Sequence, residues 1–324
     1  MYSGRVLMLS VVTASGLAAT ACSSLPEGSK RASGVYSCGQ LEIGVSGTED
    51  SKLISVDYLD RRILLKPAES ASGALYVAPG DETTRFWNKG ERATLTIQGQ
   101  TYPECLPPGG LEMPFEARGN EPFWHVTIEG QELLLTRPYE EERTRRIPVA
   151  LQTANRHGRE FVATLDDLSI TLTVAQQLCE DSMSGAQYPA QVRLAVNGGE
   201  FSGCGGDPQR LFRGAEWVVE NLAGSGIIDR SQITIEFLED NRIAGRSSCN
   251  RYTGSYKLGG EGIAFGPMAI TRMACAPVLM RQEDRFLNLL GRVASAKIGR
   301  KGELRLSTPE GDTIRAFHSG HVSP

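Results

Sequence analysis

The sequence has little of what metal-dependent and nucleotide-binding enzymes require. Only four of its 324 residues are histidines, and they form no H-x-x-x-H pair. It also lacks a C-x-x-C pair, a glycine-rich phosphate-binding loop and the G-x-S-x-G turn of serine hydrolases. Carboxylates are numerous, but no recognised spacing pairs them. We therefore expect no metal, no cofactor and no enzymatic activity.

Two further absences restrict the class of partner. No run of about 20 apolar residues is present, so no segment is long enough to cross a bilayer as a helix. No basic run with interleaved aromatic residues is present either, which argues against nucleic acid. The net charge is −4, with acidic residues in excess over residues 32–211 and basic residues in excess over 212–324. The acidic part would attract a cationic partner over about 10 Å at physiological salt.

The N-terminal segment is typical of a secreted protein. Residues 1–21 have the features of a signal peptide, because Arg5 precedes a short apolar stretch that ends in small residues. The sequence Ala-Thr-Ala-Cys that ends at Cys22 resembles a bacterial lipobox, in which the cysteine is acylated, with palmitate among its acyl chains. This predicts a lipoprotein with a tether at 22–32, and Ser23 favours the outer membrane, on its periplasmic face or its surface. A plain secretory signal cleaved before Cys22 is the alternative.

The remaining cysteines indicate an oxidising compartment and three stapled domains. Six cysteines are left after Cys22, and they fall two by two into successive segments separated by the turn-rich stretches 106–110 and 203–208. Pairing within each segment predicts the disulfides Cys38–Cys105, Cys179–Cys204 and Cys249–Cys275. The corresponding domains are expected at residues 33–105, 112–205 and 212–318. Small β-domains have marginal cores, which a disulfide would help to stabilise.

Hydrophobic periodicity predicts a mainly β protein. Apolar and polar residues alternate in stretches distributed along the chain, which is the pattern of half-buried strands. The clearest of them are Leu41–Val45, Ala93–Ile97, Ile170–Val174 and Ile233–Phe237. Only the segment from Val278 to Val293 has the period of an amphipathic helix, with Glu283 assigned to its polar face.

The first domain carries two motifs that resemble a known family. S-A-S-G-A-L-Y stands at residues 70–76 and F-W-N-K-G at 86–90, both between Cys38 and Cys105. Together they resemble the membrane-bound lysozyme inhibitors directed at c-type lysozyme. The resemblance implies a small antiparallel β-barrel. It also implies a binding site for c-type lysozyme at residues Ser72, Gly73, Tyr76 and Lys89.

These residue types suit that target. Lysozyme cleaves glycosidic bonds with two carboxyl groups, one protonated and one ionised. The Ser72 hydroxyl can donate a hydrogen bond to one carboxyl group and accept one from the other, while Lys89 can pair with the ionised group. Gly73 would permit the turn that projects Ser72, and Tyr76 would support the loop from below. The alternative is an ordinary Ser-Gly turn beside a hairpin end, with Trp87 in the core.

The second domain is similar to an uncharacterised bacterial envelope domain. The similarity rests on residues 116–124, which include Trp124, and on residues 179–189. It implies a β-rich fold and no catalytic role. Asp181 and Ser184 could form a site, but a capped turn beside the Cys179–Cys204 bridge is the favoured interpretation.

The third domain resembles the META domain of the HslJ type. The resemblance rests on C-N-R-Y-T-G at 249–254 and T-R-M-A-C at 271–275. It implies an antiparallel sheet with one helix, and a loose link to envelope stress. Four polar residues of these motifs and of the helix could line a ligand pocket or, by default, form structural hydrogen bonds around the Cys249–Cys275 link. They are Asn250, Tyr252, Arg272 and Glu283.

The leading hypothesis is an envelope lipoprotein that protects peptidoglycan by blocking c-type lysozyme. Its partners would be c-type lysozyme and, through the lipid on Cys22, a membrane. The alternative is an envelope protein of the stress response whose first domain binds a glycan or a protein and inhibits nothing. Inhibition that depends on Ser72 and Lys89 distinguishes the two.

Overall fold

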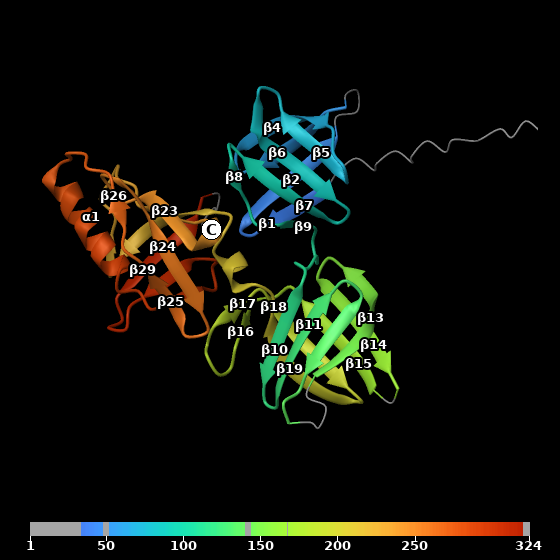
Figure 1. Ribbon diagram of the computed structural model, residues 1–324. Helices are drawn as coiled ribbons and strands as arrows, with labels where there is room; N and C mark the ends of the chain where they lie inside the picture. Colours follow the sequence, from blue (N-terminus) through green and yellow to red (C-terminus); the bar gives the residue numbers. More distant parts are fainter. Residues whose placement is uncertain (1–33, 48–51, 140–143, 167, 320–324) are drawn as a thin grey trace, which may run out of the picture. The chain divides into compact units, whose positions relative to one another are not determined.

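A computed structural model describes residues 34–47, 52–139, 144–166 and 168–319 of the chain. The predicted signal peptide, tether and acylated Cys22 lie outside the described residues. The described part is mainly β, as expected, with three antiparallel sheet systems and one α-helix (Figure 1). None of its helices is long and apolar enough to span a membrane. The bounds of the three predicted domains stay predictions.

The first sheet closes into a small antiparallel barrel, as the resemblance implied. Its strands are β1 Gly34–Cys38, β2 Leu41–Gly47, β3 Ile54–Tyr58, β4 Arg61–Ala68, β5 Ala74–Ala78, β6 Asp81–Lys89, β7 Arg92–Ile97, β8 Gln100–Thr101 and β9 Cys105–Leu106. Strand β6 pairs with both β5 and β7, which closes the sheet on itself. In β2, Leu41, Ile43 and Val45 point into the core and the residues between them do not, as strand geometry requires.

A second closed barrel follows. Its strands are β10 Phe115–Asn120, β11 Phe123–Glu129, β12 Glu132–Thr136, β13 Thr144–Asn155, β14 Gly158–Leu165, β15 Leu168–Ala175, β18 Ala190–Val196 and β19 Gly199–Gly205. A short hairpin, β16 Cys179–Glu180 with β17 Gln187–Tyr188, interrupts the order between β15 and β18. Trp124 is fully buried in the core of this barrel.

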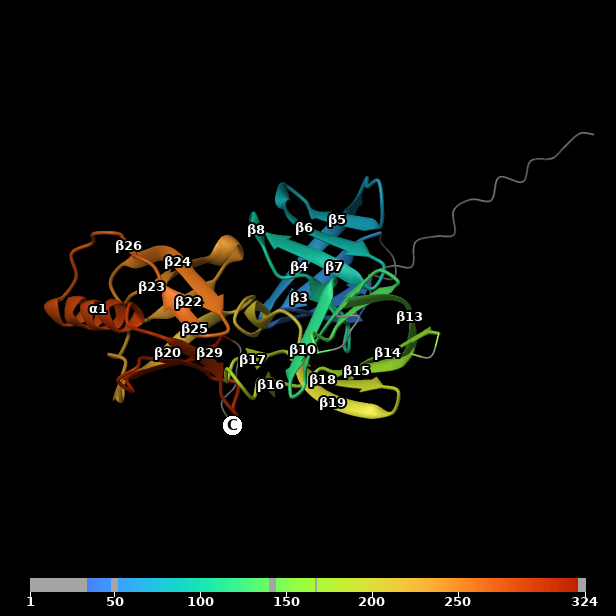
Figure 2. The ribbon, with the colours of Figure 1, turned by 60° about the horizontal axis from the view of Figure 1, so that its bottom comes forward.

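The third sheet is open and packs against the helix. Its strands are β20 Glu216–Leu222, β21 Ser225–Gly226, β22 Thr234–Phe237, β23 Arg242–Arg246, β24 Arg251–Gly259, β25 Gly262–Phe265, β26 Ala269–Ile270, β27 Ser295–Ile298, β28 Leu304–Ser307 and β29 Thr313–His318; the 3-10 turns η1 Pro208–Leu211 and η2 Glu239–Asn241 flank them. Helix α1, Pro277–Leu290, lies along the sheet in Figure 2, and Phe286 and Leu290 join its core.

The helix differs from the expectation in two respects. It ends at Leu290 rather than at Val293, which is still buried in the same core. The assignment of Glu283 to the polar face was wrong, because this side chain is only 4% exposed. Hydrogen-bond donors from outside the helix surround its carboxylate, and helical periodicity cannot reveal them.

The three predicted disulfides are confirmed. Cys38–Cys105 joins β1 to β9, Cys179–Cys204 joins β16 to β19, and Cys249–Cys275 joins the turn before β24 to the segment before α1. Each bridge lies within one of the three segments, which agrees with pairing by segment.

Candidate functional site

The two motifs of the first barrel meet at one end of a strand pair. Ser72 and Gly73 stand directly before β5, and Lys89 is the last residue of β6. The register pairs Ala74 with Asn88, so antiparallel pairing brings the start of β5 beside the end of β6. The structure therefore brings Ser72, Gly73 and Lys89 together, although the sequence separates them by a full hairpin.

Gly73 is required by the backbone at this place. Its φ is +67°, in the region that glycine adopts without strain. A Cβ atom added to Gly73 would lie 2.2 Å from the carbonyl oxygen of Asn88 and 3.1 Å from Cγ of Lys89. The absence of a side chain lets the Ser72 loop approach the end of β6.

Trp87 connects the two predicted residues. Its indole N–H donates a hydrogen bond of 2.8 Å to the carbonyl oxygen of Ser72. The ammonium of Lys89 lies 3.4 Å from the centroid of the Trp87 ring, within the range of a cation–π interaction. Sequence reasoning missed this role, because it considered Trp87 only under the alternative of an ordinary hairpin end, where it placed the indole in the core. Phe86 is the residue that points inward, so its neighbour Trp87 turns outward and is half-buried.

The polar groups that a partner would meet are exposed. The Ser72 backbone is held by Ser70, whose hydroxyl donates to the Ser72 carbonyl oxygen at 2.6 Å and accepts from its N–H at 3.3 Å. The Ser72 side chain is exposed, and its hydroxyl has no hydrogen-bond partner among the described residues. Lys89 is exposed too, and no carboxylate in the described part of the chain lies within 4.0 Å of its ammonium.

Tyr76 lies inside the barrel. It is 6% exposed and pairs across the strands with Phe86, a position compatible with support of the loop from below. Tyr36 packs edge-on against the same phenylalanine, with ring centroids 5.7 Å apart. Its hydroxyl accepts a hydrogen bond of 3.2 Å from Asn88. Burial raises the pKa of Tyr36 and exceeds the opposing effect of this hydrogen bond.

In the second barrel, Asp181 caps a turn. One of its carboxylate oxygens accepts 2.7 Å hydrogen bonds from both the backbone N–H and the hydroxyl of Ser184. The other oxygen accepts a bond of 2.9 Å from the side chain of Asn120. Burial acts to raise the pKa of Asp181, but these hydrogen bonds together hold it below its usual value. The geometry agrees with the capped turn that the sequence favoured.

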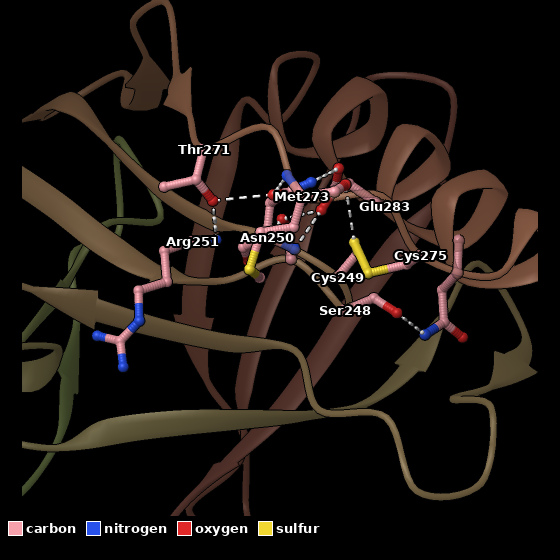
Figure 3. The surroundings of a disulfide bond; sticks show 10 residues. Ser248, Cys249, Asn250, Arg251, Thr271, Met273, Cys275 and Glu283 are labelled. Atoms are coloured by element: carbon pink, nitrogen blue, oxygen red, sulfur yellow. Dashed lines mark hydrogen bonds between the residues drawn. A yellow bond between two sulfur atoms is a disulfide. The ribbon is translucent and has the colours of Figure 1, made fainter.

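In the third domain, a buried carboxylate stabilises the loop around the disulfide (Figure 3). Glu283 accepts hydrogen bonds from the Ser247 hydroxyl at 2.5 Å, the Asn250 N–H at 2.8 Å and the Asn250 side-chain amide at 2.9 Å. The amide oxygen of Asn250 accepts in turn from the Thr271 hydroxyl at 2.9 Å and the Met273 N–H at 2.7 Å. This network connects the loop segments at residues 247–250 and 271–273 to each other and to α1.

The four polar residues considered for a ligand pocket do not converge. Asn250 and Glu283 contact each other, whereas the Tyr252 hydroxyl donates to the Thr234 carbonyl oxygen at 2.9 Å and Arg272 is exposed. Burial acts to raise the pKa of Glu283, but its hydrogen bonds outweigh burial and lower it. These contacts support the structural interpretation. Among the described residues, no group of three or more His, Cys, Asp or Glu side chains could hold a metal ion.

Two segments of the chain match known protein families. Residues 36–103 match the model of the membrane-bound lysozyme-inhibitor of c-type lysozyme family, MliC. Residues 210–320 match the META domain. The chain thus carries a segment similar to MliC followed by a segment similar to META. The arrangement expected from the sequence is thereby confirmed, and neither family is one of enzymes.

Comparisons over the whole chain add less. No curated protein matches it. Two solved structures do, an NMR structure of a protein from Burkholderia xenovorans at 27% identity and a second NMR structure at 26%. Each covers 34% of this chain, and the matches span 85% and 94% of those proteins. Their TM-scores of 0.30 and 0.29 are too low to support an inference about fold or function.

Proposed function

We propose that this protein inhibits c-type lysozyme through the end of the β5–β6 pair in its MliC domain. The observation that carries the proposal is the meeting of exposed Ser72 and exposed Lys89 at one edge of the barrel. The two residues come from separate motifs, and both motifs lie within the segment that matches the inhibitor family. Physiologically, such an inhibitor would protect peptidoglycan.

The chemistry follows from the target's catalytic groups. Lysozyme holds one carboxyl group protonated and one ionised on either side of the bond it cleaves. The Ser72 hydroxyl would donate to the ionised group or accept from the protonated one, and the Lys89 ammonium would pair with the ionised group. Insertion of both groups displaces the sugar and removes water, so these charged contacts become stronger than on an open surface.

The local charge supports an anionic target cleft. The outward-facing positions of β6 from Thr83 onward carry Arg85, Trp87 and Lys89, with no acidic residue among them. The MliC segment as a whole has more acidic than basic residues, so this cationic strip is a local feature that fits a local anionic partner.

The envelope location is part of the same proposal. The matched family is membrane-bound by description, and acyl chains on Cys22 would supply the attachment to the outer membrane. Labelling with radioactive palmitate would test this, because wild-type protein should incorporate label and the Cys22→Ala variant should not. Equal labelling of the variant, or none in wild type, would contradict lipidation at Cys22.

A cell-wall lysis assay tests the inhibitory function. The chain from Ser23 onward would be titrated against hen-type lysozyme beside Ser72→Ala and Lys89→Ala. The exposed Lys66 of the same barrel provides the matched control, Lys66→Ala. Stoichiometric inhibition by wild type and by the control, lost in both folded site variants, is the expected result. Absence of inhibition by folded wild-type protein at micromolar concentration would refute the proposal and favour a binding role without inhibition.

A further inference from the structure

Trp87 contacts both groups of the proposed inhibitory site. Its N–H donates to the carbonyl oxygen of Ser72, and its ring face lies 3.4 Å from the Lys89 ammonium. The two contacts use different parts of the indole, the polar edge and the π face, so both can exist at once.

The nature of the Lys89 contact matters for binding. A carboxylate partner would neutralise the ammonium and would have to be displaced when an ionised group of the target arrives. An aromatic ring restrains the charge without neutralising it, and the opposite side of the ammonium keeps N–H donors for the target. The ring thus restricts the Lys89 side chain before binding, so less conformational entropy is lost when the target binds.

We propose that Trp87 is the positioning residue of this site, which holds the Ser72 loop and the Lys89 ammonium in their binding arrangement before the target is present. This inference rests on the proposed inhibition of lysozyme. It adds a residue that contacts the Ser72 carbonyl oxygen and the Lys89 ammonium and that acts through Ser72 and Lys89. It also assigns each part of the indole a separate role, which conservative variants can separate.

The free protein allows a test that needs no lysozyme. A lysine side chain above an indole lies in the shielding region of the ring current, so the Lys89 Cε-bound protons should resonate upfield of those of exposed Lys66. The Lys89→Met variant identifies the resonance by its disappearance. In Trp87→Leu the shifted resonance should return to the position of Lys66. An unshifted Lys89 resonance in wild type would overturn the inference.

Inhibition of lysozyme tests the consequence. Trp87→Phe keeps a ring face but lacks the N–H donor, and loss of one neutral hydrogen bond predicts a roughly fivefold higher inhibition constant. Trp87→Leu removes the ring face as well and predicts a roughly 30-fold increase. Lys66→Met serves as the surface control, and thermal unfolding verifies that each variant is folded.

The outcomes separate this inference from the proposed function. If wild type inhibits and folded Trp87→Leu inhibits equally well, the inference alone is overturned. If wild type does not inhibit, the proposed function fails and the inference fails with it, even where the Lys89 shift is present. A graded loss from phenylalanine to leucine, together with the upfield shift, supports it.

Discussion

Replacement of Gly73 by alanine is the sharpest perturbation that the first barrel offers. The backbone at Gly73 has φ +67°, and a Cβ there would lie 2.2 Å from the Asn88 carbonyl oxygen. A left-handed conformation costs a non-glycine residue about 1–2 kcal/mol. Relief of the clash must move the loop away from the end of β6, which adds about 1–3 kcal/mol by analogy with overpacked sites. We expect Gly73→Ala to destabilise the β5–β6 pair by about 2–5 kcal/mol.

Gly80 supplies a matched control in the same hairpin. Its φ is +82°, but no atom lies within 4 Å of the position that a Cβ would occupy. Gly80→Ala therefore carries the conformational penalty of about 1–2 kcal/mol without the clash. The gain from a less flexible unfolded chain is common to both variants and cancels in the comparison. The difference between the two variants isolates the close approach of the Ser72 loop to β6.

Hydrogen exchange read by mass spectrometry measures the effect locally, which avoids assigning one unfolding free energy to a chain of several domains. Peptides from β5 and β6 should exchange about 30-fold faster or more in Gly73→Ala, and clearly less so in Gly80→Ala. The inhibition constant should rise at least tenfold in Gly73→Ala and stay within about twofold of wild type in Gly80→Ala. Equal effects of the two substitutions on exchange and on inhibition would refute the reasoning.

Further predictions concern Glu283, Arg85 and the first disulfide. Glu283→Ala leaves buried donors of Ser247 and Asn250 unpaired and should destabilise the META domain by about 3–5 kcal/mol in urea unfolding. Because the folded pKa of Glu283 is below its usual 4.5, its stabilisation is complete above that pH and should be lost as pH falls through the folded value; a pH series that shows the opposite trend would contradict this. Arg85→Glu should slow association with lysozyme about tenfold at low salt and less at high salt in stopped-flow measurements. Breaking the 67-residue Cys38–Cys105 loop with two serines should destabilise the first barrel by about 4 kcal/mol, and an unchanged melting curve would count against it.

Much of the fold was predictable because it depends on local patterns. Strand alternation at Leu41–Val45 and Ala93–Ile97 identified β2 and β7, since inward and outward positions of a strand differ in polarity. Pairing cysteines by segment gave all three disulfides. Closure of the second sheet into a barrel was not predictable, because closure depends on which distant strands pair, as in the pairing of β10 with β19. No local pattern records such pairings.

The candidate site was predictable only in part, and for a related reason. The motifs pointed to Ser72 and Lys89, but nothing in them indicated directly that both residues contact Trp87. The alternation of β6 did contain a signal, since Phe86 and Trp87 are adjacent and cannot both face the core. At Glu283 the prediction failed in the other direction, because a side chain expected to be exposed is buried. Its periodicity indicated solvent, but donors from the loop at 247–250 enclose the carboxylate.

Two charged residues of this chain are held in ways that indicate different roles. The Glu283 carboxylate is buried and accepts several hydrogen bonds, so its acceptor capacity is used within the META domain. The Lys89 ammonium is exposed and rests on an aromatic face, which leaves its donors available. A charged group with a structural role is stabilised when its hydrogen-bonding capacity is used within the fold. A charged group that binds a partner needs donors or acceptors that remain free until the partner binds. This criterion supports the proposal that the end of the β5–β6 pair, rather than the loop around the third disulfide, binds an anionic group.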